Sequence, residues 1–252
     1  MRFSPQLREF DWLVARPIAH RGLHAKSKGI IENTESAFAA AIKGNYAIEC
    51  DVQLTADGEA MVFHDDDLDR LTEANGPVKG LSAKELKRVK LKSTTDRMQT
   101  LAELLEQVDG RSTLVIELKS LWDDDDTLVK RALQILEGYD GPCCLMSFDP
   151  SLVTSVRELS PHMVRGIVAD RTTHPYYNAL PLAKRYAMRT FSHLAQTQPH
   201  FVSYYWRELP FEPVTEIRKL GYPVISWTVR SKEEASQALR YCDQVTFEGF
   251  NP

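Results

Sequence analysis

The sequence predicts a parallel (β/α)8 barrel, the TIM-barrel fold, as its fold class. Eight short apolar runs that read as strands recur along the chain, and a helical pattern separates nearly every pair of them. Such alternation is typical of a parallel sheet covered by helices. The length of 252 residues agrees, because one such barrel takes about 250 residues. The strands are expected to begin at residues 17, 47, 113, 143, 164, 201, 224 and 244.

Helix start signals between these strands support the alternation. Asn33 or Thr34 is a suitable N-cap for an apolar helix over 37–42, which Gly44 ends. Three capping boxes and two pairs of an acidic residue with proline predict further helix starts. These are Ser82 with Glu85, Thr100 with Glu103, Ser231 with Glu234, Asp149 with Pro150, and Glu212 with Pro213. An acidic run over 123–126 is expected to serve another helix start, because carboxylates are favoured there, rather than a second metal site.

We expect residues 1–252 to form one domain, because no repeat, low-complexity tract or linker divides them. The segment 66–100 is largely polar and too long for a plain loop, so it is expected to be a small insertion after the second strand. A helix is expected within it over 82–90. An amphipathic N-terminal helix over 5–15 is expected to cover one end of the fold, where the chain leaves no room for an eighth helix.

The composition argues against several kinds of binding partner. The chain is 43% hydrophobic and 26% charged, as in ordinary globular proteins, and its net charge of -4 provides no basic surface for nucleic acid or anionic membranes. Four cysteines without C-x-x-C spacing predict neither a disulfide framework nor a zinc site. Charged residues interrupt the N-terminal apolar residues, so we expect no signal peptide, no stable membrane insertion and a cytoplasmic location. The oligomeric state is left open.

Three carboxylates lie toward the C-terminal ends of predicted strands, where barrel enzymes carry their catalytic side chains. Glu49 and Asp51 are two residues apart and share one face of the second strand, and Glu117 lies at the end of the third. Buried together, they would repel one another without a cation. Carboxylate oxygens suit a hard divalent ion. We therefore predict one metal ion, Mg2+ or Ca2+, held by Glu49, Asp51 and Glu117.

Basic residues and histidines lie at the same strand ends. His20 and Arg21 end the first strand, His64 follows the second, and Lys119 ends the third. Phosphodiester hydrolysis needs a Lewis acid, a positive group for the developing charge, and an acid and a base. We predict that Arg21 and Lys119 hold a small-molecule phosphodiester and that His20 and His64 move protons. The pattern leaves open which histidine is the base.

Taken together, these motifs resemble the glycerophosphodiester phosphodiesterase family. The matching signatures follow the family's order over nearly the whole chain: His20-Arg21-Gly22, Glu32-Asn33-Thr34, Glu49-Cys50-Asp51-Val52, Asp57-Gly58, His64-Asp65, the turn from Gly76 to Leu81, Glu117-Leu118-Lys119, Ser147-Phe148 and Trp227-Thr228-Val229. The resemblance implies a barrel with a small insertion after strand two, the same three metal ligands and the same histidine pair. It also implies an alcohol and sn-glycerol 3-phosphate as products, with Trp227 and Phe148 lining the alcohol site.

Two positions depart from the family's pattern. Arg230 stands where Trp-Thr-Val-Asn commonly ends in asparagine, and Phe247-Glu248 stands where the last strand commonly ends in Thr-Asp. We expect Arg230 and Glu248 to pair with each other or to contact an unusual head group. Arg230 is therefore included among the candidate substrate-binding residues.

Other functions remain open. A phospholipase D-like lyase on the same barrel would close the product into a cyclic phosphate. A binding protein would hold phosphodiesters without turnover, although the presence of both His20 and His64 argues against it. A metal-dependent sugar isomerase is disfavoured, because Arg21 beside His20 suits phosphate better than a neutral sugar.

Overall fold

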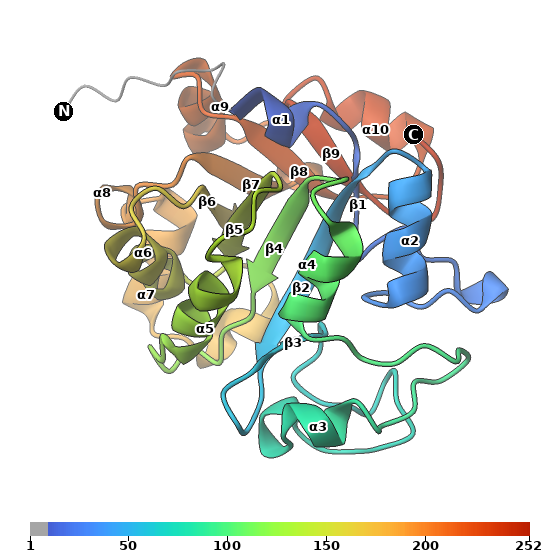
Figure 1. The fold of residues 1–252 in the computed structure, drawn as a ribbon. Coiled ribbons are helices and arrows are strands. Elements are labelled where there is room, and N and C mark those ends of the chain that lie inside the picture. Colours follow the sequence, from blue (N-terminus) through green and yellow to red (C-terminus); the bar gives the residue numbers. More distant parts are fainter. Residues whose placement is uncertain (1–9) are drawn as a thin grey trace.

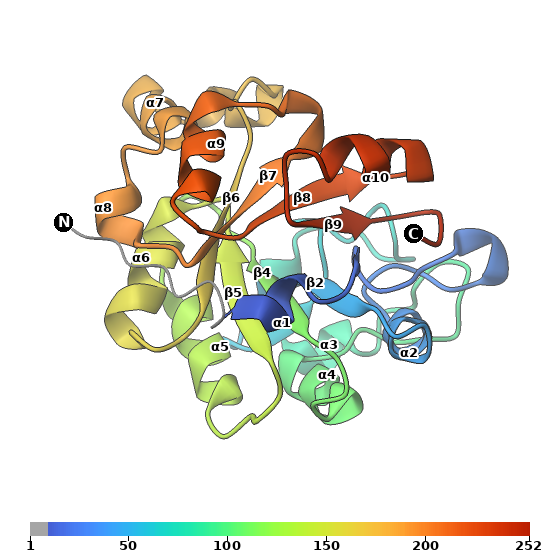
Figure 2. The same ribbon diagram turned by 90° about the horizontal axis from the view of Figure 1, so that it is seen from above.

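A computed structural model describes residues 10–252 of the protein. Within these residues, eight parallel strands close into a barrel in the order β1-β9-β8-β7-β6-β5-β4-β2, and β1 pairs with β2 to complete the ring (Figures 1 and 2). The expected (β/α)8 barrel is confirmed. Each strand begins within one residue of its expected start. The strands are β1 (Ile18–Ala19), β2 (Ala47–Leu54), β4 (Leu114–Leu118), β5 (Cys143–Ser147), β6 (Arg165–Ala169), β7 (Phe201–Tyr205), β8 (Val224–Val229) and β9 (Gln244–Phe247).

Helices lie outside the barrel strands (Figure 2). Most of the connections between successive strands contain at least one helix, as the alternating sequence pattern predicts. The helices are α1 (Asp11–Val14), α2 (Glu35–Lys43), α3 (Ala83–Leu86), α4 (Leu101–Val108), α5 (Thr127–Leu136), α6 (Pro150–Leu159), α7 (Leu182–Thr190), α8 (Leu194–Thr197), α9 (Glu212–Lys219) and α10 (Lys232–Ala238).

Several expected helix starts are confirmed. Thr34 Oγ1, rather than the Asn33 side chain, accepts the Ala37 N–H at 3.5 Å to begin α2. Ser82 and Thr100 each complete a capping box with the glutamate three residues later. These side chains satisfy N–H groups that a helix start otherwise leaves without partners.

The acidic starts of α6 and α5 behave in two ways. Asp149 accepts the Ser151 N–H at 3.0 Å and so caps α6 as expected. In the acidic run over 123–126, Asp125 accepts the Thr127 N–H at 3.0 Å at the start of α5. Asp126, which directly precedes α5, makes no side-chain cap bond, so the expected role of the run at a helix start is met by Asp125 alone.

Two other helix starts differ from expectation. Ser231 accepts the Glu234 N–H, but the Glu234 carboxylate accepts the Arg230 N–H instead of completing the box. The expected cap at Glu212 is wrong: Phe211 precedes α9 without a side-chain bond, and Glu212 is the first helical residue. The proline that follows Glu212 lies in the first turn, where a missing N–H removes no intrahelical bond.

The end of the barrel that holds the strand starts is closed by α1. Its Leu13 is completely buried in a cluster of residues from the barrel interior. Gln244 Nε2, at the start of β9, donates to the Val14 carbonyl at 2.9 Å. The expected N-terminal cover is therefore present over residues 11–14, while residues 5–9 of the expected helix lie outside the described part of the chain.

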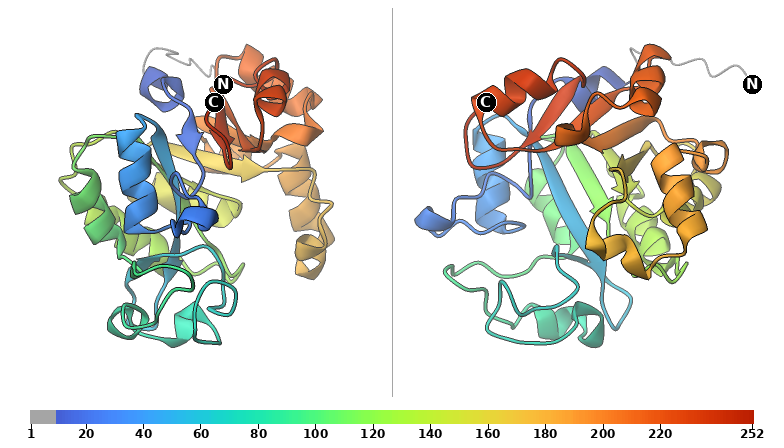
Figure 3. Two further views of the ribbon diagram at one scale, coloured as in Figure 1. Left: turned by 90° about the vertical axis from the view of Figure 1, so that its right-hand side faces the viewer. Right: turned by 180° about the vertical axis from the view of Figure 1, so that it is seen from behind.

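The expected insertion follows a short additional strand, β3 (Ala60–Val62), which runs antiparallel to β2. Residues of the insertion form a separate apolar cluster together with residues of β3 and its neighbours. The members are Met61, Phe63, Leu68, Val78, Leu86, Leu91 and Met98. Figure 3 shows this segment and α7 on either side of the same end of the barrel. The insertion thus forms one wall beside the strand ends.

The helix within the insertion is shorter than the expected span of 82–90. Helix α3 ends at Leu86, and the Lys90 carbonyl accepts the Glu73 N–H at 3.0 Å. The chain leaves the helix because this backbone pairing with a distant segment satisfies its polar groups instead.

Candidate active site

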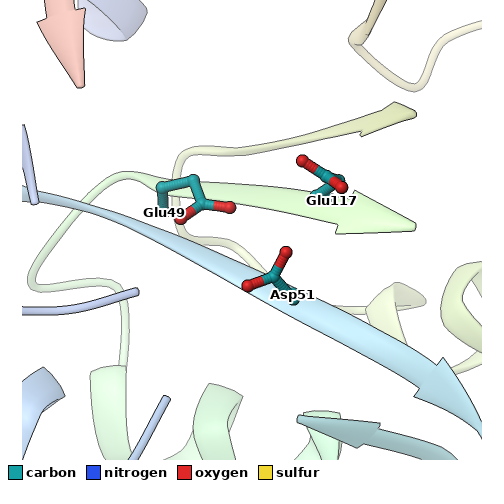
Figure 4. A group of neighbouring side chains, drawn as sticks. All are labelled: Glu49, Asp51 and Glu117. Carbon is teal, nitrogen blue, oxygen red and sulfur yellow. The ribbon is translucent and has the colours of Figure 1, made fainter. Parts of the chain in front are cut away.

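Three buried carboxylates meet where β2 and β4 lie side by side. Asp51 and Glu117 are register partners on the two strands, and Glu49 precedes Asp51 by one side-chain repeat on the same face. Their exposed fractions are 2% for Glu49, 1% for Asp51 and 8% for Glu117. One oxygen from each lies within 4.8 Å of the others (Figure 4). Within residues 10–252 this is the one set of three or more acidic, histidine or cysteine ligands that could hold a metal ion.

The electrostatics of this cluster fit a bound cation. Burial, followed by the charges of Asp51 and Glu117, raises the pKa of Glu49 well above its ordinary value. Burial also opposes ionisation of Asp51, yet Lys119, His64 and Arg21 together lower its pKa. Ionisation of Glu49 beside the other two carboxylates is therefore unfavourable without a further cation. A hard divalent ion with oxygen ligands would satisfy the three carboxylates.

The segment after β1 fixes the orientation of the carboxylates. Asn33 donates from Nδ2 to Asp51 Oδ2 at 2.9 Å and accepts the Asp51 N–H at 3.3 Å. The Arg21 N–H donates to Glu49 Oε2 at 2.8 Å. We expected Asn33 only as a helix cap, so its bond to a metal-ligand candidate is a new observation, although the motif Glu32-Asn33-Thr34 had marked the segment.

This arrangement needs glycine at position 22, because both the backbone dihedral angle and the neighbouring helix exclude a side chain there. Its φ is +77°, and an added Cβ would lie 2.9 Å from Ala37 of α2. The Gly22 N–H donates to the Glu49 carbonyl at 3.2 Å. The chain can therefore turn directly after Arg21 and still pack against α2.

His20 is held by a carboxylate from the last strand. His20 Nδ1 lies 2.9 Å from Glu248 Oε2, and His20 Nε2 lies 3.9 Å from Glu49 Oε2. The hydrogen bond from His20 lowers the pKa of Glu248 to about 2, so Glu248 is an ionised acceptor. Nδ1 therefore carries the hydrogen, and Nε2 faces the carboxylate cluster. Burial lowers the pKa of His20 to about 4.

His64 has the same kind of partner. Its Nδ1 lies 2.6 Å from Asp65 Oδ1. Arg70, in the insertion, donates to both oxygens of Asp65. His64 lines the substrate-sized cavity described below, and its charge contributes to the low pKa of Asp51. Both histidines therefore border the carboxylate cluster and have Nδ1 engaged by a carboxylate.

The two candidate phosphate-binding residues also lie at this cluster. Lys119 Nζ is 2.7 Å from Glu117 Oε1 and 3.4 Å from Asp51 Oδ1. Arg21 Nη1 donates to Glu32 at 2.6 Å, and its Nε lies 3.3 Å from Asp51 Oδ2. Two positive groups thus lie in contact with the carboxylate cluster.

A cavity of about 1000 Å³ opens beside Glu117, Lys119 and His64. Trp227 and Phe148 both line it, with their rings edge to face at 5.4 Å. The remaining wall includes polar residues of the insertion and three further aromatic residues: Asp66, Asp67, Asp69, Arg70, Trp122, Tyr177 and Tyr205. The cavity thus joins a polar phosphate end to an aromatic wall.

Arg230 pairs with Glu248, which is one of the two arrangements that the sequence predicts. Arg230 Nη2 lies 3.3 Å from Glu248 Oε2, the same oxygen that His20 contacts. Arg230 is not among the residues that line the cavity. Its geometry therefore links it to His20 through Glu248.

The fold and the site together define a class of protein, a barrel enzyme for phosphate-ester chemistry. Its strand ends carry a carboxylate cluster that could hold a metal ion, two carboxylate-paired histidines and two positive side chains. These are the groups that metal-assisted hydrolysis of a phosphodiester needs.

Comparison with known proteins identifies the family. The Glycerophosphoryl diester phosphodiesterase family matches residues 20–246, and the chain belongs to this family of phosphoric diester hydrolases. A glycerophosphodiester phosphodiesterase of Caldanaerobacter subterraneus subsp. tengcongensis is 30% identical over 235 residues, which cover 88% of this chain and 89% of the relative.

Solved structures share the fold. A phosphodiesterase of Oleispira antarctica, in complex with the product sn-glycerol-3-phosphate, superposes with a TM-score of 0.77 at 23% identity and covers 94% of each chain. A putative glycerophosphoryl diester phosphodiesterase of Silicibacter pomeroyi has a TM-score of 0.76 at 24% identity, over 92% of this chain and 89% of that one. Within residues 10–252, no helix combines the length and apolar character that a bilayer span requires.

Proposed function

We propose that this protein hydrolyses glycerophosphodiesters to an alcohol and sn-glycerol 3-phosphate. The observation that carries the proposal is the buried cluster of Glu49, Asp51 and Glu117, bordered by two histidines whose Nδ1 atoms are held by carboxylates. Membership of the family supports it, as does the glycerol phosphate bound to the Oleispira antarctica enzyme.

Glu49, Asp51 and Glu117 would hold one divalent ion, Mg2+ or Ca2+. When bound, such an ion supplies a Lewis acid for a non-bridging phosphate oxygen. Asn33 keeps the Asp51 carboxylate oriented, and the Arg21 N–H does the same for Glu49. The protein therefore presents preorganised oxygen ligands, so little rearrangement is needed when the ion binds.

The positive side chains and the histidines act on the phosphodiester itself. Arg21 and Lys119 bind the phosphate oxygens and stabilise the charge that develops on them. One of His20 and His64 accepts a proton from the attacking water, and the other donates a proton to the leaving alcohol oxygen. The carboxylates at their Nδ1 atoms keep the Nε2 atoms available for these transfers.

The aromatic wall would hold the alcohol part of the substrate. Trp227 and Phe148 form an apolar surface in the same cavity that Glu117, Lys119 and His64 line. Apolar and aromatic linings with a few fixed polar groups are typical of small-molecule sites. The substrate would therefore lie with its phosphate at Lys119 and its alcohol against Trp227.

Phosphorus NMR of the purified protein with a panel of glycerophosphodiesters tests this function. Hydrolysis is expected to produce glycerol phosphate and free alcohol in equal amounts, and chelation with EDTA is expected to abolish turnover until Mg2+ or Ca2+ is restored. A cyclic phosphate product would instead assign the protein to the lyases. Full activity in EDTA would contradict the metal role, and binding without turnover would contradict catalysis.

A further inference from the structure

Arg70 of the insertion bridges two carboxylates beside the site. Its Nε and Nη2 donate to Asp65 at 2.5 Å and 2.8 Å. Its Nη1 and Nη2 donate to Glu32 at 3.0 Å and 2.7 Å. One guanidinium therefore makes two bonds to each of two carboxylates, a geometry that the planar, forked donor set of arginine allows and a lysine ammonium does not.

Each of these carboxylates holds a candidate functional residue. Glu32 accepts a hydrogen bond from Arg21 Nη1 at 2.6 Å. Asp65 engages His64 Nδ1 at 2.6 Å. A continuous series of contacts therefore runs from Arg21 through Glu32, Arg70 and Asp65 to His64. It joins a phosphate-binding candidate at the end of β1 to a proton-transfer candidate after β3.

We propose that Arg70 is a positioning residue, which keeps the Arg21 guanidinium and the His64 ring in their working orientations through Glu32 and Asp65. This inference rests on the proposed function. The inference gives the insertion a part in positioning the site, because Arg70 lies in the insertion and not in a barrel strand.

The Arg70 side chain is 46% exposed, so its position depends on the two carboxylates and on the backbone that carries it. Leu68, two residues before it, is completely buried in the apolar cluster of the insertion. Thr72, two residues after it, is 1% exposed, and its N–H donates to the Leu68 carbonyl at 3.0 Å. The backbone on both sides of Arg70 is therefore anchored, as a supporting residue of a site requires.

The charges of Glu32 and Asp65 depend on the same bridge. Burial would raise the pKa of Glu32, but its bonds to Arg70 and Arg21 lower it to about 2. Burial also opposes ionisation of Asp65, whereas its bonds to His64 and Arg70 lower its pKa. Without Arg70, two carboxylates that lie side by side would lose their shared cation and repel each other. Each would then reorient, together with the residue that it holds.

Three variants test the inference. Arg70→Ala is expected to lower kcat roughly ten- to a hundred-fold, as for loss of an outer partner of a catalytic group. Arg70→Lys is expected to restore little of this loss, because a single ammonium cannot hold both carboxylates. The matched control is Arg131→Ala, since Arg131 makes a comparable two-bond pair with Glu59, at 2.9 Å and 2.8 Å, outside the cavity lining. The control is expected to retain wild-type kcat.

A second measurement does not depend on turnover. Nitrogen-15 NMR of the His64 ring is expected to show hydrogen on Nδ1 in the wild type and in the Arg131 control, and a mixture of tautomers in both Arg70 variants. Wild-type kcat and an unchanged His64 tautomer in Arg70→Lys would overturn the inference. Absence of phosphodiesterase activity in the wild type would overturn the proposed function instead, while the NMR result would still decide the role of Arg70.

Discussion

His20 Nδ1 and Glu248 Oε2 lie 2.9 Å apart, so the first and last strands of the barrel are joined through a candidate proton-transfer residue. Glu248 directly follows β9, and β9 pairs with β1 in parallel. Closure of the barrel therefore creates this contact between residues 228 positions apart in the chain. A carboxylate at Nδ1 fixes the tautomer and the orientation of an imidazole ring.

Glu248→Gln is expected to lower kcat roughly ten- to a hundred-fold while KM changes little, because the change affects proton transfer rather than phosphate binding. The amide keeps the size of the side chain but removes the charge that holds the Nδ1 hydrogen. Steady-state kinetics on one glycerophosphodiester measure the effect. Glu216→Gln is the control, because Glu216 is an exposed partner of Lys219 on α9. An unchanged kcat in Glu248→Gln would contradict the role of Glu248.

Arg230→Asn is expected to lower kcat less than Glu248→Gln and to lower it equally for substrates with different alcohols. The physical reason is that Arg230 contacts Glu248 at 3.3 Å and does not line the cavity. The kcat/KM ratio for two head groups measures this. A changed ranking of head groups would show that Arg230 contacts the alcohol.

The double variant of Glu248→Gln and Arg230→Asn provides a sharper comparison. If Arg230 acts through Glu248, the two effects are expected to be non-additive, and the second change should add little to the first. Additive effects would indicate two independent roles.

Glu49→Gln is expected to weaken binding of the divalent ion and to lower the rate roughly a hundred-fold or more, because the Lewis acid contributes several kcal/mol to such reactions. Calorimetric titration with Mg2+ and Ca2+ measures the affinity directly. Glu106→Gln, at an exposed position of α4, is the control. Equal metal affinity of Glu49→Gln and the wild type would rule out Glu49 as a ligand.

His193 is expected to make the stability of the protein fall as the pH is lowered. It is 5% exposed, and burial lowers its pKa from 6.5 to about 4. The unfolded chain then binds the proton more readily than the folded protein does. Above pH 6.5 His193 is neutral in both states and does not lower the free energy of unfolding. As the pH falls from 6.5 toward about 4, the unfolded chain gains the proton first, so the free energy of unfolding decreases.

Urea unfolding at several pH values measures this dependence. Between about pH 7.5 and about pH 5, His193 is expected to account for about 2 kcal/mol of the loss in unfolding free energy. His193→Gln should flatten the pH dependence by that amount, although half-buried His20 and His200 add slopes of the same sign. Exposed His162→Gln is the control. Parallel pH curves for wild type and His193→Gln would contradict the prediction.

The strands and the three metal-ligand candidates could be predicted from the sequence because they depend on local periodicity. Alternation places Glu49 and Asp51 on one face of a strand whatever the strand packs against. The same holds for Glu117 and Lys119. Parallel strands in a barrel then bring their C-terminal ends to one place, and the three carboxylates are found together there.

The errors came from features that tertiary contacts decide. The helix expected over 82–90 ends early because Lys90 pairs with Glu73, a contact that local propensity does not encode. The cap expected at Glu212 is wrong because a cap depends on the backbone dihedrals before the helix as well as on residue type.

The sequence by itself thus determined the fold class, the order of the strands and the residues that end them. Only the tertiary structure decided which charged groups pair: His20 with Glu248, and Arg70 with both Glu32 and Asp65. The physical reason is the separation along the chain of the residues that interact. Strand and helix patterns arise from neighbouring residues, whereas a hydrogen bond between distant side chains depends on barrel closure, strand register and rotamer together.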